Sequence, residues 1–303
     1  MYRHVGRAVV RAVAVAATVG AVVSGCAGGP NQVGSAVIIG STSVPIEQVQ
    51  SRLDVALGKT GAVAQLAASG VGPPEIARDL VTRTVLHDLI ARTAAAERIT
   101  VSEADVDSAL EQGGGADAAL DQTLYDLPAL RERVRDRIIA ARYAQKEVPG
   151  LTVTADLIAA ASQDDAEQKA RVVAAGGPAA DALFAQNPDT SRRGMPYQAA
   201  TSPEAAATVL FGLPPGRTAY FQPSPQSGWI VLRVTDRRTE PNADPSAVAG
   251  LGESDLATIG ERLLQPLAEQ VGVRVNPRYG VWDPISLRVV PADQTDGAIL
   301  PPA

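Results

Sequence analysis

The sequence predicts an α+β fold in which a mainly helical domain is interrupted by a small inserted α+β domain. Residues 75–143 show helical apolar spacing in several segments and almost no strand signal. From about residue 170 the chain changes to short apolar segments separated by glycine and proline. Trp229 to Thr235 (WIVLRVT), β-branched and aromatic, is the clearest strand. A helix and strand-like segments over 253–290 then follow a linker, and we expect them to complete the helical domain.

The helical domain is expected over residues 34–150. Its elements, in chain order, are a short strand at 35–40, a helix that Pro45 opens, a long helix over 75–98, a helix with Ser102 as N-cap, and a helix over 127–143. The long helix carries apolar residues on more than one face, so it should be central. Pro149 and Gly150 break the helical pattern and mark the end of the domain.

Two changes in the pattern of apolar, glycine and proline residues divide the rest of the chain. The expected parts are an inserted domain over 155–238, a linker over 239–252, a C-terminal helix with strands over 253–290, and a disordered tail over 291–303. Val101 and Val106 around Ser102 have the spacing of a hydrophobic staple. Thr154, with Val153 before it and Ile158 after it, repeats this pattern of N-cap and staple and predicts another helix start.

Composition and charge exclude several classes of protein. The chain has 303 residues, a formal net charge of −6 and no basic block of the nucleic-acid-binding type. It has two histidines and one cysteine, so a Cys/His metal centre, a disulfide framework and a thiol–imidazole pair are close to excluded. We therefore expect no nucleic acid, metal or cofactor among its partners.

The first 25 residues have the pattern of a lipoprotein signal peptide. Three arginines precede an uncharged stretch over 12–23 that is too short for a membrane-spanning helix and suits a secretory signal. The stretch ends in Val-Ser-Gly-Cys, which resembles the bacterial lipobox, and the thiol of Cys26 would take the diacylglycerol. Residues 26–33 then form a flexible tether. This predicts a lipid anchor on the outer face of the cell membrane; an ordinary cleaved signal with a chance cysteine is the alternative.

The order of the pieces resembles the SurA/PrsA group of extracytoplasmic chaperones. In the N-terminal part the resemblance rests on ITVSEADVDSAL, the helix LRERVRDRIIAARY and the following VTADLI. The segment GLPPGRTAYFQPSPQSGWIVLRVTDRR resembles the last third of a parvulin-type prolyl isomerase domain, and VRVNPRYGVWD resembles the end segment of actinobacterial members. The resemblance implies a SurA N-terminal-like chaperone domain, an inserted parvulin-like domain, and a C-terminal segment that packs on the N-terminal domain.

The resemblance fails at the histidines of the parvulin family. That family places one histidine on the first strand, in an A-R-H-I-L-like run, and another on the last strand. The matching positions here are expected to be Val172 and Ile230, which have no side-chain hydrogen-bonding atoms. The two histidines of the chain, His4 and His87, lie in the signal peptide and in the long helix. We therefore expect no catalytic residues.

The aromatic residues are the candidates for peptide binding. The candidate residues are Phe211, Tyr220, Phe221, Trp229, Tyr279 and Trp282. Such side chains anchor peptides when exposed and build a core when buried, and a core role is favoured for most of them. The sequence thus predicts a membrane-anchored chaperone for unfolded or newly secreted polypeptides, without isomerase catalysis. A divergent active isomerase and an envelope lipoprotein with one dedicated partner are the alternatives.

Overall fold

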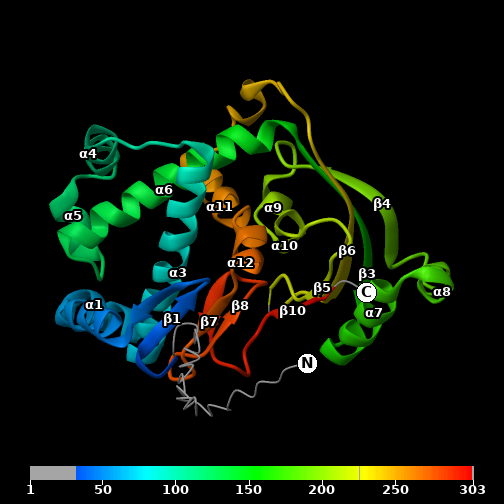
Figure 1. Cartoon of the computed structure of the whole chain (residues 1–303), viewed down its shortest axis with the longest axis horizontal. Coiled ribbons are helices and arrows are strands. Elements are labelled where there is room, and N and C mark those ends of the chain that lie inside the picture. The colour runs from blue at the N-terminus through cyan, green and yellow to red at the C-terminus, as the bar shows by residue number, and fades with distance from the viewer. Residues whose placement is uncertain (1–31, 225, 302–303) are drawn as a thin grey trace, which may run out of the picture.

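The computed structural model describes residues 32–301 apart from residue 225, and the predicted fold class is confirmed. The signal peptide and Cys26 lie outside the described residues. Figure 1 shows a helical part joined to a part built around a twisted sheet, with the two in contact along α6 and α11.

The helical part begins with a strand pair and continues through six helices. In chain order these are β1 (Ser35–Ile39), β2 (Thr42–Pro45), α1 (Ile46–Gly58), α2 (Thr60–Ala68), α3 (Pro73–Glu97), α4 (Glu103–Gln112), α5 (Ala116–Gln122) and α6 (Leu127–Glu147). Two of the starts have clear local causes. The Ser102 hydroxyl accepts from the backbone N–H of Asp105 in a capping box, and Asp126 caps α6 through the N–H of Ala129. The predicted central position of α3 follows from its buried residues, which occupy several faces.

The C-terminal segment returns to this helical part. Its elements are α11 (Glu253–Arg262), α12 (Gln265–Val271), β7 (Val273–Val275), β8 (Val281–Asp283) and β9 (Arg288–Val290). β7 pairs antiparallel with β1 and gives a sheet of order β2-β1-β7. Leu264, Val275 and Val289 share one apolar core with Val81 and Leu89 of α3. The first helices therefore depend on residues nearly two hundred positions later for their cover.

The inserted part is a five-stranded antiparallel sheet with helices on both faces. Its elements are β3 (Leu151–Ala160), α7 (Gln163–Ala175), α8 (Gly177–Gln186), β4 (Ser191–Gln198), α9 (Pro203–Ala206), α10 (Val209–Gly212), β5 (Thr218–Phe221) and β6 (Trp229–Thr239), with short 3-10 turns at Val148–Gly150 and Pro245–Val248. The strand order is β10-β5-β6-β3-β4. One face packs on α7 and α8 through Ile158, Val173 and Val231. The other face packs on α6, α10 and α11 through Leu232, Phe211 and others in one large core, so the two parts are joined by shared apolar contacts.

Three expectations about local structure are wrong. Thr154 lies in the middle of β3 and caps no helix, because Leu151, Val153 and Ala155 alternate into the core on a strand. Residues 170–173, expected to be the first strand, lie in helix α7. The tail is not wholly disordered, since β10 (Gly297–Leu300) pairs antiparallel with β5.

Candidate functional site

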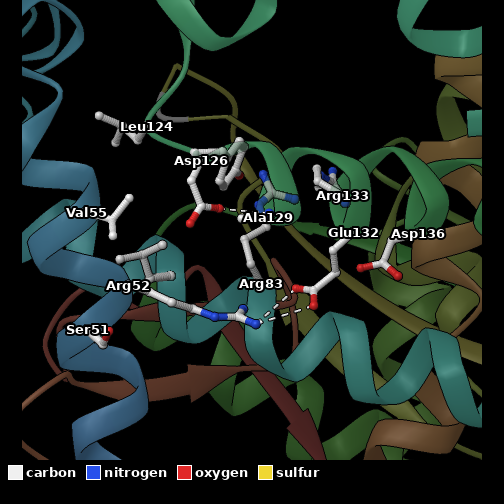
Figure 2. A pocket seen from close by; sticks show the side chains of 12 residues that line it. Ser51, Arg52, Val55, Arg83, Leu124, Asp126, Ala129, Glu132, Arg133 and Asp136 are labelled. Atoms are coloured by element: carbon white, nitrogen blue, oxygen red, sulfur yellow. Dashed lines mark hydrogen bonds and ion pairs between the residues drawn. The ribbon is translucent and has the colours of Figure 1, made fainter. Parts of the chain in front are cut away.

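A partly enclosed pocket lies in the helical part, between α1, α3 and the start of α6 (Figure 2). Its volume is about 110 Å³. Cavities of roughly 150 Å³ hold one benzene ring, so the pocket has the size of a single apolar side chain. Most of its lining surface is apolar, from Val55, Leu80, Leu124 and Ala129, and the side chain of Val55 is exposed at its edge.

Charged side chains line the α6 wall of this pocket. Arg52 of α1 forms an ion pair with Glu132, at 3.2 Å between Nη2 and Oε1, as the dashed lines in Figure 2 mark. Four residues along α6, Asp136 lies 3.0 Å from Nδ1 of His87 on α3. Nε2 of His87 lies 3.9 Å from Glu132, so a continuous chain of charges joins α1, α6 and α3.

The pKa values of the histidine pair are both shifted. The hydrogen bond with Asp136 raises the pKa of His87 above its ordinary value, despite some opposition from burial. Burial raises the pKa of the Asp136 carboxyl, and the interaction with His87 opposes that shift. The hydrogen bond with Asp136 therefore favours the protonated form of the imidazole.

This cluster of charged residues is not predicted by the sequence. Glu132 and Asp136 are four residues apart and so share one face of α6, which is a signal the sequence does contain. Nothing in it indicates that the face would meet His87 and Arg52, because those contacts depend on how three helices pack.

The inserted domain lacks histidine at the positions expected to match the family. Val172 lies half-buried on helix α7, which packs on one face of the sheet, so its assignment to the first strand is wrong. Ile230 lies on β6 as expected, where it faces Ala159 of β3 and packs against the large shared core.

A buried carboxylate stands on the first strand instead. Asp156 of β3 is 7% exposed and lies opposite Arg233 of β6. Its Oδ1 accepts the backbone N–H of Gly194 at 2.8 Å, and its Oδ2 lies 3.6 Å from Nε of Arg193. Arg233 donates to the backbone oxygen of Val173 at 3.0 Å, which ties the sheet to α7. These polar groups are satisfied within the domain.

Comparison with protein families identifies this domain. Residues 140–248 match the family model of the PPIC-type PPIASE domain. The inserted domain is a PPIC-type parvulin domain. It contains no histidine, since the two histidines of the chain are His4 and His87.

Solved structures of PrsA proteins are similar to the chain at low identity. They are the peptidylprolyl isomerase PrsA of Bacillus anthracis (16% identity, covering 65% of this chain and 99% of that chain, TM-score 0.26), the foldase protein PrsA of Streptococcus pneumoniae (14%, 64% and 83%, TM-score 0.24) and the foldase protein PrsA of Lactococcus lactis (12%, 80% and 95%, TM-score 0.23). None of the curated proteins matches the chain.

Most of the candidate peptide-binding aromatics are core residues. Phe211 is fully buried, and Tyr220, Phe221 and Tyr279 are at most 8% exposed. Trp229, at the start of β6 in the parvulin domain, and Trp282 on β8 are partly exposed. The ring of Trp229 lies 6.1 Å from that of Tyr220, in a tilted pair. Of the six candidates, these two tryptophans are the ones with surface to offer a ligand.

The described part of the chain offers neither a metal-ligand cluster nor a membrane span. No group of three or more His, Cys, Asp or Glu side chains there could hold a metal ion. Within the same residues, no helix has the length and apolar character needed to cross a membrane.

Proposed function

We propose that the protein is a lipid-anchored chaperone on the outer face of the cell membrane that binds unfolded or newly secreted polypeptides without catalysing prolyl isomerisation. The observation that supports this most directly is a PPIC-type domain, inserted in a helical domain, that contains no histidine. Cys26, at the end of the lipobox-like Val-Ser-Gly-Cys, supplies the anchor. Neither a nucleotide nor a cofactor is needed for such binding.

The residues at the expected catalytic positions argue against isomerase chemistry. On β3 the run Thr154–Ile158 (TADLI) lies on the first strand of the domain and has the form of the A-R-H-I-L run, with Asp156 in place of histidine. That carboxylate is engaged by Gly194 and Arg193. Ile230, at the second position, offers an aliphatic side chain that can neither donate nor accept a hydrogen bond.

Client binding requires a surface that accepts apolar side chains without depending on a particular client sequence. The pocket between α1, α3 and α6 has the volume for one such side chain and opens at Val55. Trp229 and Trp282 add partly exposed apolar area outside it. Burying one aliphatic side chain contributes about 1.5–3 kcal/mol, which is enough for weak and exchangeable capture when several sites act together.

The test compares two activities of the purified mature protein. We expect it to slow the aggregation of a chemically unfolded client at near-stoichiometric ratios without nucleotide. We also expect no acceleration of cis–trans exchange in proline tetrapeptides, whose uncatalysed time is on the order of 10–100 s. An active parvulin serves as the positive control for the second assay.

Two outcomes would replace this proposal with the alternatives. Acceleration comparable to that by the control parvulin would favour the divergent isomerase. Absence of both activities would favour an envelope lipoprotein with a dedicated partner, and the first residues to substitute would then be the partly exposed Trp229 and Trp282.

A further inference from the structure

The end of the chain forms an added strand on the edge of the parvulin sheet. β10 pairs with β5 in the register Gly297 with Phe221 and Leu300 with Thr218. Figure 1 shows β10 beside β5, at the edge of the inserted sheet that lies nearer to β8 of the helical part, with β4 at the opposite edge. β5 therefore has β6 on one side and the chain's own terminal segment on the other.

The side chains of β10 lie on both faces of the sheet edge and are only partly buried there. Ala298 and Leu300 pack towards α7 with Tyr220, whereas Ile299 packs on the opposite face with the large core. The three side chains are partly exposed and entirely apolar, and the strand carries no charge. The edge thus accepts an extended, uncharged segment with alternating small and larger apolar residues.

β10 adds only partly buried side chains to the two cores that the sheet shares. It is four residues long, and its neighbours Tyr220 and Phe221 are also paired with β6. The position where it begins is held from the helical part, because the backbone N–H of Asp296 donates to Oδ2 of the fully buried Asp283 at 3.3 Å. Undocking would free the strand while this anchor keeps its start close by.

We infer that the edge of β5 is a binding site for an extended apolar segment of an unfolded polypeptide, and that β10 occupies this site in the free protein. The inference rests on the proposed chaperone function. An edge strand offers unpaired backbone N–H and C=O groups, which bind any extended chain with little regard to its sequence. That property suits a protein whose clients share no sequence but do expose apolar extended segments. The occupant in the free protein has that same character.

The gain in client affinity on removing β10 depends on the fraction of molecules in which β10 is docked. A segment tethered by a short linker acts at an effective concentration on the order of mM. If β10 is docked in 90–99% of molecules, removing it should raise the affinity for a competing segment by about 10–100-fold, because the competent fraction rises to unity. The full-length protein would then bind clients weakly at this edge.

The test uses truncation after Asp296 and a point substitution. Gly297 has a φ of +149°, and a Cβ on it would lie 2.0 Å from the backbone oxygen of Tyr220, so Gly297→Ala should displace β10 without removing it. The matched control is Gly250→Ala, where a Cβ would meet nothing within 4 Å. The probes are a fluorescent peptide with the sequence of residues 295–303 and a chemically unfolded model client. Hydrogen exchange at Tyr220, whose backbone groups face β10, reports whether β10 has undocked.

We expect the truncated protein and Gly297→Ala to bind both probes at least about tenfold more tightly than the parent and Gly250→Ala do. Unchanged or weaker binding of either probe, with exchange showing that β10 has gone, would overturn the inference. If the parent suppresses aggregation and the truncated protein does so no better, the inference fails and the proposed function stands. If neither protein suppresses aggregation, the proposed function fails and the inference falls with it.

Discussion

Gly260 of α11 lies directly against Ala140 of α6, so closely that a Cβ on Gly260 would fall 1.9 Å from the backbone oxygen of Ala140. The two helices cross at this point, and both contribute to the core under the inserted sheet. α6 precedes the parvulin domain in sequence and α11 follows it. The contact therefore closes the helical part across the insertion.

Gly260→Ala should destabilise the protein by about 1–3 kcal/mol, since the helix backbones must separate to admit a methyl group. The measurement is the free energy of unfolding from a denaturant titration followed by circular dichroism. Gly250→Ala, with open space around the added Cβ, should change it by less than about 0.5 kcal/mol. Equal midpoints for the two variants would show that α6 and α11 do not pack this closely.

The sequence predicted the parts of the fold whose signals are local. Ser102 caps α4 through its own hydroxyl, and WIVLRVT forms a strand because β-branched and aromatic residues suit a pleated, half-buried surface. The resemblance also led to the correct arrangement of an inserted parvulin domain and a returning C-terminal segment. These features needed no knowledge of which distant residues touch.

The errors arose where distant contacts decide the structure. Val153, Thr154 and Ile158 have the spacing of a helix start, but β3 is held as a strand by ladders with β4 and β6. Gly297–Leu300 has no signal of its own that would pair it with Thr218–Phe221. The pocket was missed for the same reason, since its walls come from α1, α3 and α6.

The His87 pair should make stability depend on pH. The pKa of His87 is raised in the folded protein, so its stabilisation is fully present below the ordinary histidine pKa of about 6.5 and is lost as pH rises through the folded value. The groups facing it are Asp136 at 3.0 Å and Glu132 at 3.9 Å, with Arg52 beyond, and the ring is 42% exposed. We therefore expect a loss of at most about 1 kcal/mol between pH 6 and pH 9.

The check is the free energy of unfolding at both pH values for the parent, His87→Gln and Asp136→Asn. Each substitution removes one partner of the pair, so the pH dependence in this window should shrink in both variants. A parent and a His87→Gln variant with the same slope would contradict the assignment.

Cys26→Ala should abolish lipid attachment. The thiol is the group that would take the diacylglycerol, and two or more acyl chains hold a protein at a membrane far more durably than one. Expressed in the native host, the variant should accumulate as an unprocessed precursor or be released, as shown by cell fractionation and by mass spectrometry of the N-terminus. Ser24→Ala, which keeps a small residue at its position, is the matched control. Normal membrane retention of Cys26→Ala would refute the anchor.

Filling the pocket should weaken client binding while leaving the fold intact. Ala129 is a partly buried residue of the pocket wall in the first turn of α6, and leucine is nearly as good a helix former as alanine. If the pocket takes one apolar side chain of a client, Ala129→Leu removes burial worth about 1.5 kcal/mol and should raise the Kd for an unfolded client about tenfold. Fluorescence anisotropy of the labelled client measures this change in Kd.

Ala95→Leu, at an exposed position of α3 outside the pocket lining, is the control and should bind like the parent. The same Kd for Ala129→Leu and Ala95→Leu, at unchanged melting temperature, would mean that clients bind elsewhere, and the exposed parts of Trp229 and Trp282 would be substituted next.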